Sequence, residues 1–161
     1  AEILELASYK VITAENGKSG LEKAIASVPD LIICDIMMPV LDGYGVLHVL
    51  QKNDDLKQIP FIFLSAKSER ADMRKGMEMG ADDYITKPFT ETELLSAIES
   101  RLKKAELLTN ELANGLEGWS KVVQTVTGKD PMGALKEDRN VNKYKKKQII
   151  YSEGNHPGRL Y

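Results

Sequence analysis

The chain has 161 residues and a formal net charge of −2, from 22 Lys and Arg against 24 Asp and Glu. This balance excludes a strongly basic nucleic-acid-binding body, and a hydrophobic content of 42% excludes a disordered or fibrous chain. The single cysteine, Cys34, excludes a disulfide framework and a zinc site built from cysteines, and it favours a reducing compartment. No apolar run reaches the roughly 18 residues of a membrane span and nothing resembles a secretory signal, so we expect a soluble, cytoplasmic protein.

The first 108 residues alternate short apolar runs with helical periodicity. Two of the runs, Leu31–Cys34 and Phe61–Leu64, are continuously apolar, which is typical of strands buried on both faces of a parallel sheet. Strands that alternate with helices imply right-handed crossovers and a doubly wound sheet. In chain order the pattern predicts a helix end at 2–8, a strand at 10–14, a helix at 18–28, a strand at 31–34, a helix at 45–52, a strand at 61–64, a helix at 68–79 and a strand at 84–86.

The next helix has the clearest start of all. Thr90 and Glu93 form a capping box, which satisfies the first free backbone amides. Beyond it a heptad seam alternates steps of three and four through Leu95, Ile98, Leu102, Ala105, Thr109, Leu112, Leu116 and Trp119. Two interpretations stay open: a helix that packs on its own domain and ends near Gly115, or one that continues as a homodimer or interdomain signalling helix.

The remaining chain changes character twice. Residues 109–142 predict a helix extension followed by a linker, with at most one helical turn at 134–138. Residues 143–161 hold a lysine run, a strand-like run at 148–151 and a cluster of turn residues, from which we expect a second, incomplete domain. The chain lacks an initiator methionine and stops in mid-pattern, so we also expect a fragment of a longer protein.

Chemically active side chains come directly after three of the predicted strands. They are Asp35, Ser65 and Lys87, and ligands of open parallel sheets bind at this carboxyl edge. Each alone is best explained as a polar residue that ends a strand, but the three together suit phosphoryl transfer to a carboxylate. Asp35 is the candidate nucleophile, while Lys87 and Ser65 can stabilise the negative charge of the transition state. Mg²⁺ is also needed, and we find no second carboxylate directly after a strand.

These residues carry a family resemblance. The motifs Asp35-Ile36-Met37-Met38-Pro39, Asp42-Gly43, Ser65-Ala66 and Lys87-Pro88-Phe89 resemble the receiver domain of two-component response regulators over residues 1–105. The resemblance implies a flavodoxin-like fold and a phosphoacceptor, Asp35, that takes its phosphoryl group from a sensor histidine kinase. It also implies a Mg²⁺ ligand in the Met37 backbone carbonyl, a cis peptide bond between Lys87 and Pro88, and a conformational switch through Ser65 and Tyr84.

The sequence departs from the family at its start. Receivers begin with a strand that ends in a pair of acidic residues, and then form their first helix. Residues 1–9 of this chain resemble only the end of that helix. We therefore expect the first strand to be absent, leaving an interior position of the sheet empty between residues 10–14 and 31–34. From this we expect weak Mg²⁺ binding and a destabilised fold.

The tail resembles a second family. Residues 144–154, together with Pro157 and Leu160-Tyr161, are similar to the opening strands of a cyclic-nucleotide-binding β-roll of the catabolite-activator type. A disordered basic tail is the alternative. We assign no ligand, because the residues that would hold a nucleotide lie beyond Tyr161.

The leading hypothesis is a phosphorylation-switched, non-enzymatic response regulator that controls an effector, with transcription as its output and any DNA contact made by a domain beyond this chain. One alternative is a degenerate receiver that acts as a protein-interaction or ligand-binding module. Another is a phosphatase of the haloacid-dehalogenase type, which would need an aspartate where this chain has Met37.

Overall fold

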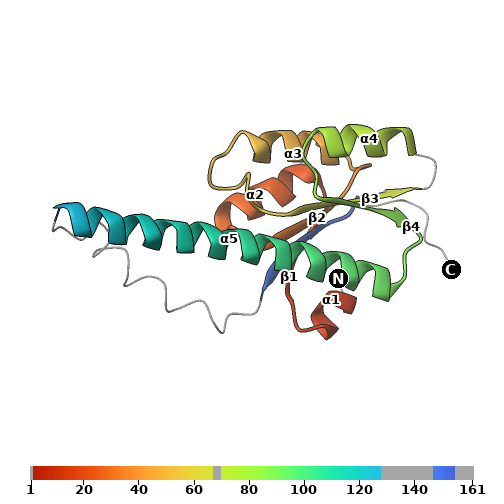
Figure 1. The fold of residues 1–161 in the computed structure, drawn as a ribbon. Coiled ribbons are helices and arrows are strands. Elements are labelled where there is room, and N and C mark those ends of the chain that lie inside the picture. Colours follow the sequence, from red (N-terminus) through yellow and green to blue (C-terminus); the bar gives the residue numbers. More distant parts are fainter. Residues whose placement is uncertain (1, 67–69, 128–146, 155–161) are drawn as a thin grey trace.

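The computed structural model describes residues 2–66, 70–127 and 147–154 as a parallel α/β sheet with helices on both faces (Figure 1). The strands are β1 (Lys10–Ala14), β2 (Leu31–Asp35), β3 (Phe61–Ala66), β4 (Asp83–Lys87) and β5 (Gln148–Ser152). The helices are α1 (Glu2–Leu6), α2 (Gly17–Ser27), α3 (Gly43–Gln51), α4 (Arg70–Glu78) and α5 (Glu91–Thr127). The sheet has the order β1-β5-β2-β3-β4, and every neighbouring pair is parallel. The predicted doubly wound fold is confirmed.

Two hydrophobic cores lie on the two faces of the sheet. On one face the core includes Ile32, Cys34, Phe61 and Phe63 from the strands, covered by α2 and α3, and α4 lies on this side as well (Figure 1). On the other face α1 and α5 cover a core that includes Leu31, Ile33, Ile62 and Leu64. The strands β2 and β3 supply alternate residues to both faces, which explains why their sequences are continuously apolar.

Side-chain caps fix where the helices begin. Asp42 accepts a hydrogen bond from the Gly45 backbone N–H at 2.7 Å and so starts α3 directly after the loop that leaves β2. At α5 the predicted capping box is present: the Thr90 N–H donates to Glu93 Oε2 at 2.8 Å, and the Glu93 N–H donates to Thr90 Oγ1 at 3.2 Å. Within the described residues, no helix is long and apolar enough to cross a membrane.

The interior position that we expected to be empty is filled. β5 lies there, between β1 and β2, with register pairs such as Ile150 to Ile12 on one side and Ile150 to Ile32 on the other. Ile149 and Ile150 are fully buried. An unfilled position would leave the backbone groups of β1 and β2 unpaired along their facing edges, and β5 satisfies both edges.

This placement differs from our interpretation of the tail. We expected residues 143–161 to open a separate β-roll, but their described part is an interior strand of the single sheet. The apolar run was recognised correctly as a strand and placed in the wrong sheet, because nothing local to the run says which strands it pairs with.

The last helix resolves the choice left open at Gly115. α5 continues as one helix to Thr127, so the interpretation in which it ends near Gly115 is wrong. Leu94, Ile98 and Leu102 bury its first third against the sheet, whereas Leu112 and Leu116 further along are exposed. The linker and helical turn predicted after α5 lie outside the described residues.

Candidate functional site

Asp35 ends β2 at the carboxyl edge of the sheet, where the sequence predicted it. Its side chain is almost wholly buried and bonded at both oxygens: Oδ1 accepts the Met37 backbone N–H at 3.0 Å, and Oδ2 accepts the Lys87 ammonium at 2.8 Å. Burial of a carboxylate costs free energy unless its oxygens are paired and hydrogen-bonded. The structure therefore holds both oxygens of Asp35 in fixed positions at the carboxyl edge of the sheet.

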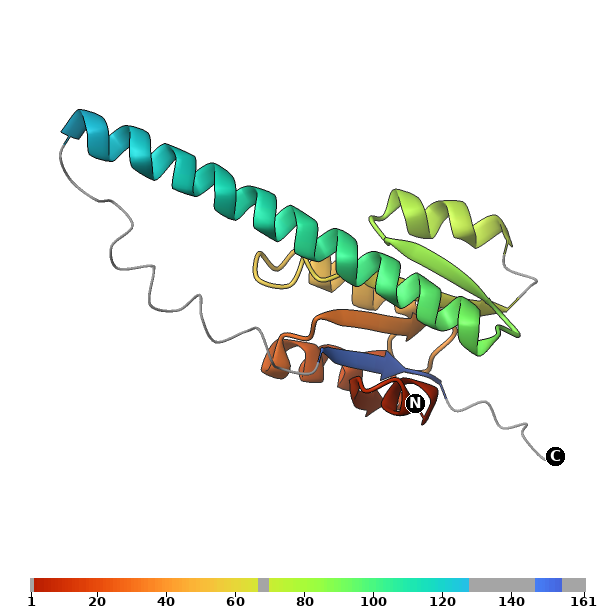
Figure 2. The same cartoon turned by 60° about the horizontal axis from the view of Figure 1, so that its bottom comes forward.

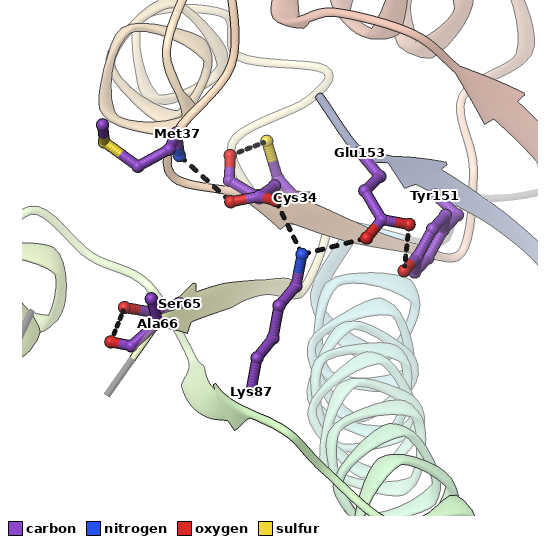
Figure 3. Close-up of polar contacts among 8 residues, drawn as sticks. Cys34, Met37, Ser65, Ala66, Lys87, Tyr151 and Glu153 are labelled. Carbon is purple, nitrogen blue, oxygen red and sulfur yellow. Dashed lines mark hydrogen bonds and ion pairs between the residues drawn. The ribbon is translucent and has the colours of Figure 1, made fainter. Parts of the chain in front are cut away.

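Lys87, at the end of β4, holds two carboxylates at once. Its Nζ lies 2.8 Å from Asp35 Oδ2 and 2.9 Å from Glu153 Oε1 (Figure 3). Burial by itself would lower the pKa of this ammonium, but the hydrogen bonds and charges of the two carboxylates outweigh burial and raise the pKa. Lys87 thus stays charged, and the predicted cis peptide bond to Pro88 is present directly after it.

Glu153 is the site residue that sequence reasoning missed. It comes directly after β5, and its Oε2 accepts a hydrogen bond from the Tyr151 hydroxyl at 2.9 Å (Figure 3). Burial raises the pKa of Glu153, but the hydrogen bonds from Lys87 and Tyr151 outweigh it, so the net pKa is lowered. The expectation that no second carboxylate stands after a strand is therefore corrected. The signal was available, because Glu153 is a charged residue directly after an apolar run, as Asp35 is.

The tail also contacts the loop after β2. A Cβ built at Gly154 would lie only 2.8 Å from the Met37 carbonyl oxygen, so any side chain at this position would force the two segments apart. Gly154 is buried. The glycine lets the backbone after β5 lie directly against the carbonyl that we predict as a metal ligand.

Ser65 and Tyr84 lie on the same half of the sheet. Ser65 is buried near the end of β3, opposite Thr86 of β4, and its hydroxyl donates to the Ala66 carbonyl at 3.0 Å (Figure 3). Tyr84 is half-buried, with its ring centroid 6.3 Å from that of Phe63. Of the predicted site residues, Lys87 contacts Asp35 directly. The switch roles of Ser65 and Tyr84 stay predictions.

The donor groups at this edge suit a hard divalent cation. Asp35 and Glu153 offer two carboxylates that meet at one ammonium, and the Met37 carbonyl lies in the adjoining loop. Mg²⁺ binds through one or two carboxylates and keeps several waters. Among the residues that the structure describes, no group of three or more His, Cys, Asp and Glu could hold a metal ion.

The sequence of the chain matches a known family. The sequence profile of the response regulator receiver domain matches residues 1–99. The chain belongs to this family. Among curated proteins, "Probable transcriptional regulator ycf27" of Pyropia yezoensis is 44% identical over 109 residues, which make up 68% of this chain and 44% of the relative. The chain thus spans less than half the length of this regulator.

Solved receivers have the same fold. The signal receiver domain of a signal transduction histidine kinase from Syntrophus aciditrophicus is 37% identical, with a TM-score of 0.59, over 64% of this chain and 78% of that one. The receiver domain of the sensor histidine kinase PA1611 from Pseudomonas aeruginosa is 26% identical, with a TM-score of 0.59, over 63% and 84% of the two chains. In that receiver a magnesium ion is coordinated in the active-site cleft.

Proposed function

We propose that this chain is the phosphorylation-switched part of a response regulator and that Asp35 accepts the phosphoryl group from a phosphohistidine of a sensor histidine kinase. The observation that carries the proposal is the buried Asp35 carboxylate, held by Lys87 and by the Met37 N–H at the carboxyl edge of the sheet. Membership of the receiver family supports it.

The transfer needs little chemistry from the protein itself. A carboxylate oxygen of Asp35 forms a bond to phosphorus while the phosphorus–nitrogen bond of the phosphohistidine breaks, and the imidazole leaves with the bonding electrons. The product is an acyl phosphate on Asp35. Lys87 faces the same oxygens and supplies a positive charge for the phosphoryl group, which its raised pKa keeps available.

Asp35, Glu153 and the Met37 carbonyl are the groups that would hold Mg²⁺. The cation would neutralise charge on the phosphoryl oxygens. The receiver of PA1611 supports this part of the proposal, because its active-site cleft holds a magnesium ion. In this chain Glu153 replaces the acidic pair that the resemblance associates with a first strand, so one ligand comes from the tail.

Phosphorylation would be relayed by Ser65 and Tyr84 to the effector. Ser65 would meet the phosphoryl group through its hydroxyl, and Tyr84 would change its packing against Phe63. The curated relative is a transcriptional regulator more than twice the length covered by the match, which favours transcription as the output and DNA contact through a region other than the one matched here. Signalling by a sensor kinase implies a cytoplasmic location.

A degenerate receiver that acts only as an interaction module remains the second candidate. The intact Asp35–Lys87 pair favours a phosphorylated receiver over that candidate, because a module that never accepts phosphate has no need to keep a buried charge pair.

Incubation with a small phosphoryl donor, acetyl phosphate or phosphoramidate, together with Mg²⁺ tests the proposal. We expect intact-mass spectrometry to show one added phosphoryl group, none on Asp35→Asn, and normal labelling of Asp55→Asn, a matched change at an exposed aspartate. Labelling that survives in Asp35→Asn, or a wild-type chain that gains no phosphoryl group, would contradict the proposal and favour the interaction module.

A further inference from the structure

Tyr151 lies on β5, the interior strand that Figure 2 shows in blue, two residues before Glu153. Its side chain packs against the core that α1 and α5 cover, and its hydroxyl donates to Glu153 Oε2 at 2.9 Å. The Glu153 N–H donates to the Ala14 carbonyl at 3.2 Å, so the pairing with β1 continues to this residue. Side chains two positions apart along an extended strand share a face. A hydroxyl anchored in the core therefore contacts a carboxylate at the edge of the sheet.

The register of β5 brings this pair to the phosphoacceptor. Tyr151 is paired with Ile33 of β2, and two further steps along both parallel strands bring Glu153 opposite Asp35. Lys87 then contacts both carboxylates. The backbone register thus decides which residues meet at this edge, but it does not decide where the two oxygens of the Glu153 side chain point.

The Glu153 side chain needs a fixed partner to present an oxygen in one direction. It is 46% exposed, and holding a long side chain in a single conformation costs conformational entropy. Tyr151 is suited to offset this cost, because its ring has only two side-chain torsions and is already packed against the core. With Oε2 held by the tyrosine hydroxyl, Oε1 lies on the side of Lys87, 2.9 Å from its Nζ.

We propose that Tyr151 is a positioning residue of the cation site: its hydroxyl holds Oε2 of Glu153 and so presents Oε1 to a divalent cation shared with Asp35. The proposal rests on the Mg²⁺ site of the proposed function and adds the group that orients one of its ligands. Groups that form hydrogen bonds to metal ligands fix the orientation of those ligands and contribute to metal affinity.

The competing explanation is that the hydrogen bond only satisfies the hydroxyl of a half-buried tyrosine. In that case its loss would affect the stability of the fold, and the affinity for a cation would not depend on it. The two explanations therefore differ in what the removal of one oxygen atom does to Mg²⁺ binding.

The test is calorimetric titration of the full chain with Mg²⁺, with the wild type compared to Tyr151→Phe, which removes the hydroxyl and keeps the ring in the core. We expect the dissociation constant for Mg²⁺ to rise about tenfold. The matched control is Tyr9→Phe, the same change at a second tyrosine that packs against the same core. Tyr9 directly precedes β1, at the opposite edge of the parallel sheet, so we expect wild-type affinity in this variant.

A double-mutant comparison separates positioning from structural support. In the Glu153→Ala background the hydroxyl has no carboxylate to hold, so adding Tyr151→Phe should cause no further loss of Mg²⁺ affinity. Unchanged affinity in Tyr151→Phe alone, or an equal loss in both backgrounds, would overturn the proposal.

The titration needs no phosphoryl donor, so its outcome is separate from that of the labelling of Asp35. A wild-type chain that binds Mg²⁺ but gains no phosphoryl group would contradict the phosphoacceptor role and not the role of Tyr151. A wild-type chain that binds no Mg²⁺ would overturn the role of Tyr151 together with the cation site.

Discussion

The strands β2 and β5 are neighbours in the sheet, although β2 lies in the first quarter of the chain and β5 is the last described strand. Both are interior strands of the sheet, and a carboxylate at or directly after the end of each meets the Lys87 ammonium, Asp35 from β2 and Glu153 from β5. All five residues of β2 are buried, whereas Gln148 and Tyr151 of β5 are only half-buried. Gln148 Nε2 is also the one buried side-chain nitrogen or oxygen without a hydrogen-bond partner among the described residues.

The different burial of β2 and β5 shows that a sequence can form a strand without being adapted at every position to its place in the sheet. The sequence of β2 is adapted at every position to a site buried on both faces, while β5 fits the same environment with only its two isoleucines and Ser152. If β5 is nevertheless an integral strand, its buried residues should contribute as much to the free energy of unfolding as those of β2.

The largest expected effect compares one isoleucine from each strand. Ile33 of β2 and Ile149 of β5 are both fully buried in the same core, so Ile33→Ala and Ile149→Ala should each lower the free energy of unfolding by about 2–5 kcal/mol. Urea denaturation measures both. A cost below about 0.5 kcal/mol for Ile149→Ala, with the full cost for Ile33→Ala, would show that β5 is not an integral strand.

Removing the Lys87 ammonium, which Asp35 and Glu153 share, should have the next largest effect on stability. Lys87→Ala leaves two carboxylates without their common partner, and we expect a loss of about 1–3 kcal/mol that added Mg²⁺ partly restores. Lys57→Ala is the matched control, because Lys57 pairs with the highly exposed Asp54. Solvent screens this pair, so we expect the change to have little effect on stability and no response to Mg²⁺. If Lys87→Ala and Lys57→Ala lost equal amounts of stability, or if Mg²⁺ did not restore stability to Lys87→Ala, the results would argue against a site at which Asp35 and Glu153 bind one cation together.

A change at Gln148 of β5 should raise stability, whereas the preceding changes lower it. Gln148→Met keeps the length of the side chain and removes the unpaired amide nitrogen, so we expect the protein to become more stable by about 1 kcal/mol. Thermal unfolding followed by circular dichroism is sufficient to detect it. A clear loss of stability would mean that the amide has a partner that matters.

The smallest expected effect is on how the stability of the fold falls at acidic pH. Because the folded-state pKa of Glu153 lies below its ordinary value of 4.5, its contribution is present above about pH 4.5 and is lost as the pH falls through the folded-state pKa. Lys87 behaves in the opposite sense: its raised pKa stabilises the fold at lower pH, and this contribution is lost only as the pH rises through the folded-state pKa, above 10.5. Unfolding curves of the wild type and Glu153→Gln should therefore converge on acidification. A gap that stays constant from neutral pH to pH 3 would contradict the lowered pKa.

The first 108 residues made most of the fold predictable. Runs such as Leu31–Cys34 identify strands because burial on both faces removes polar residues, and the carboxyl-edge rule then brought Asp35 and Lys87 together without a structure. The course of α5 past Gly115 could not be decided, since the helix-breaking tendency of glycine and the heptad seam point in opposite directions.

The place of β5 could not be predicted for a different reason. Its pairing joins residues that are more than a hundred positions apart, such as Gln148 and Asp30, and no local pattern encodes that distance. Once the run was assigned to another domain, Glu153 could not be counted at the phosphoacceptor edge.

The central claim is that Asp35 and Glu153, which lie 118 positions apart in the sequence, form one Mg²⁺ site, and calorimetric titration with Mg²⁺ tests it most directly. We predict that Asp35→Asn and Glu153→Gln each weaken Mg²⁺ binding about tenfold or more, while Glu22→Gln, at an exposed carboxylate on α2, binds as the wild type does. Wild-type affinity in Glu153→Gln, with the loss confined to Asp35→Asn, would show that the tail strand contributes no ligand and would contradict the account.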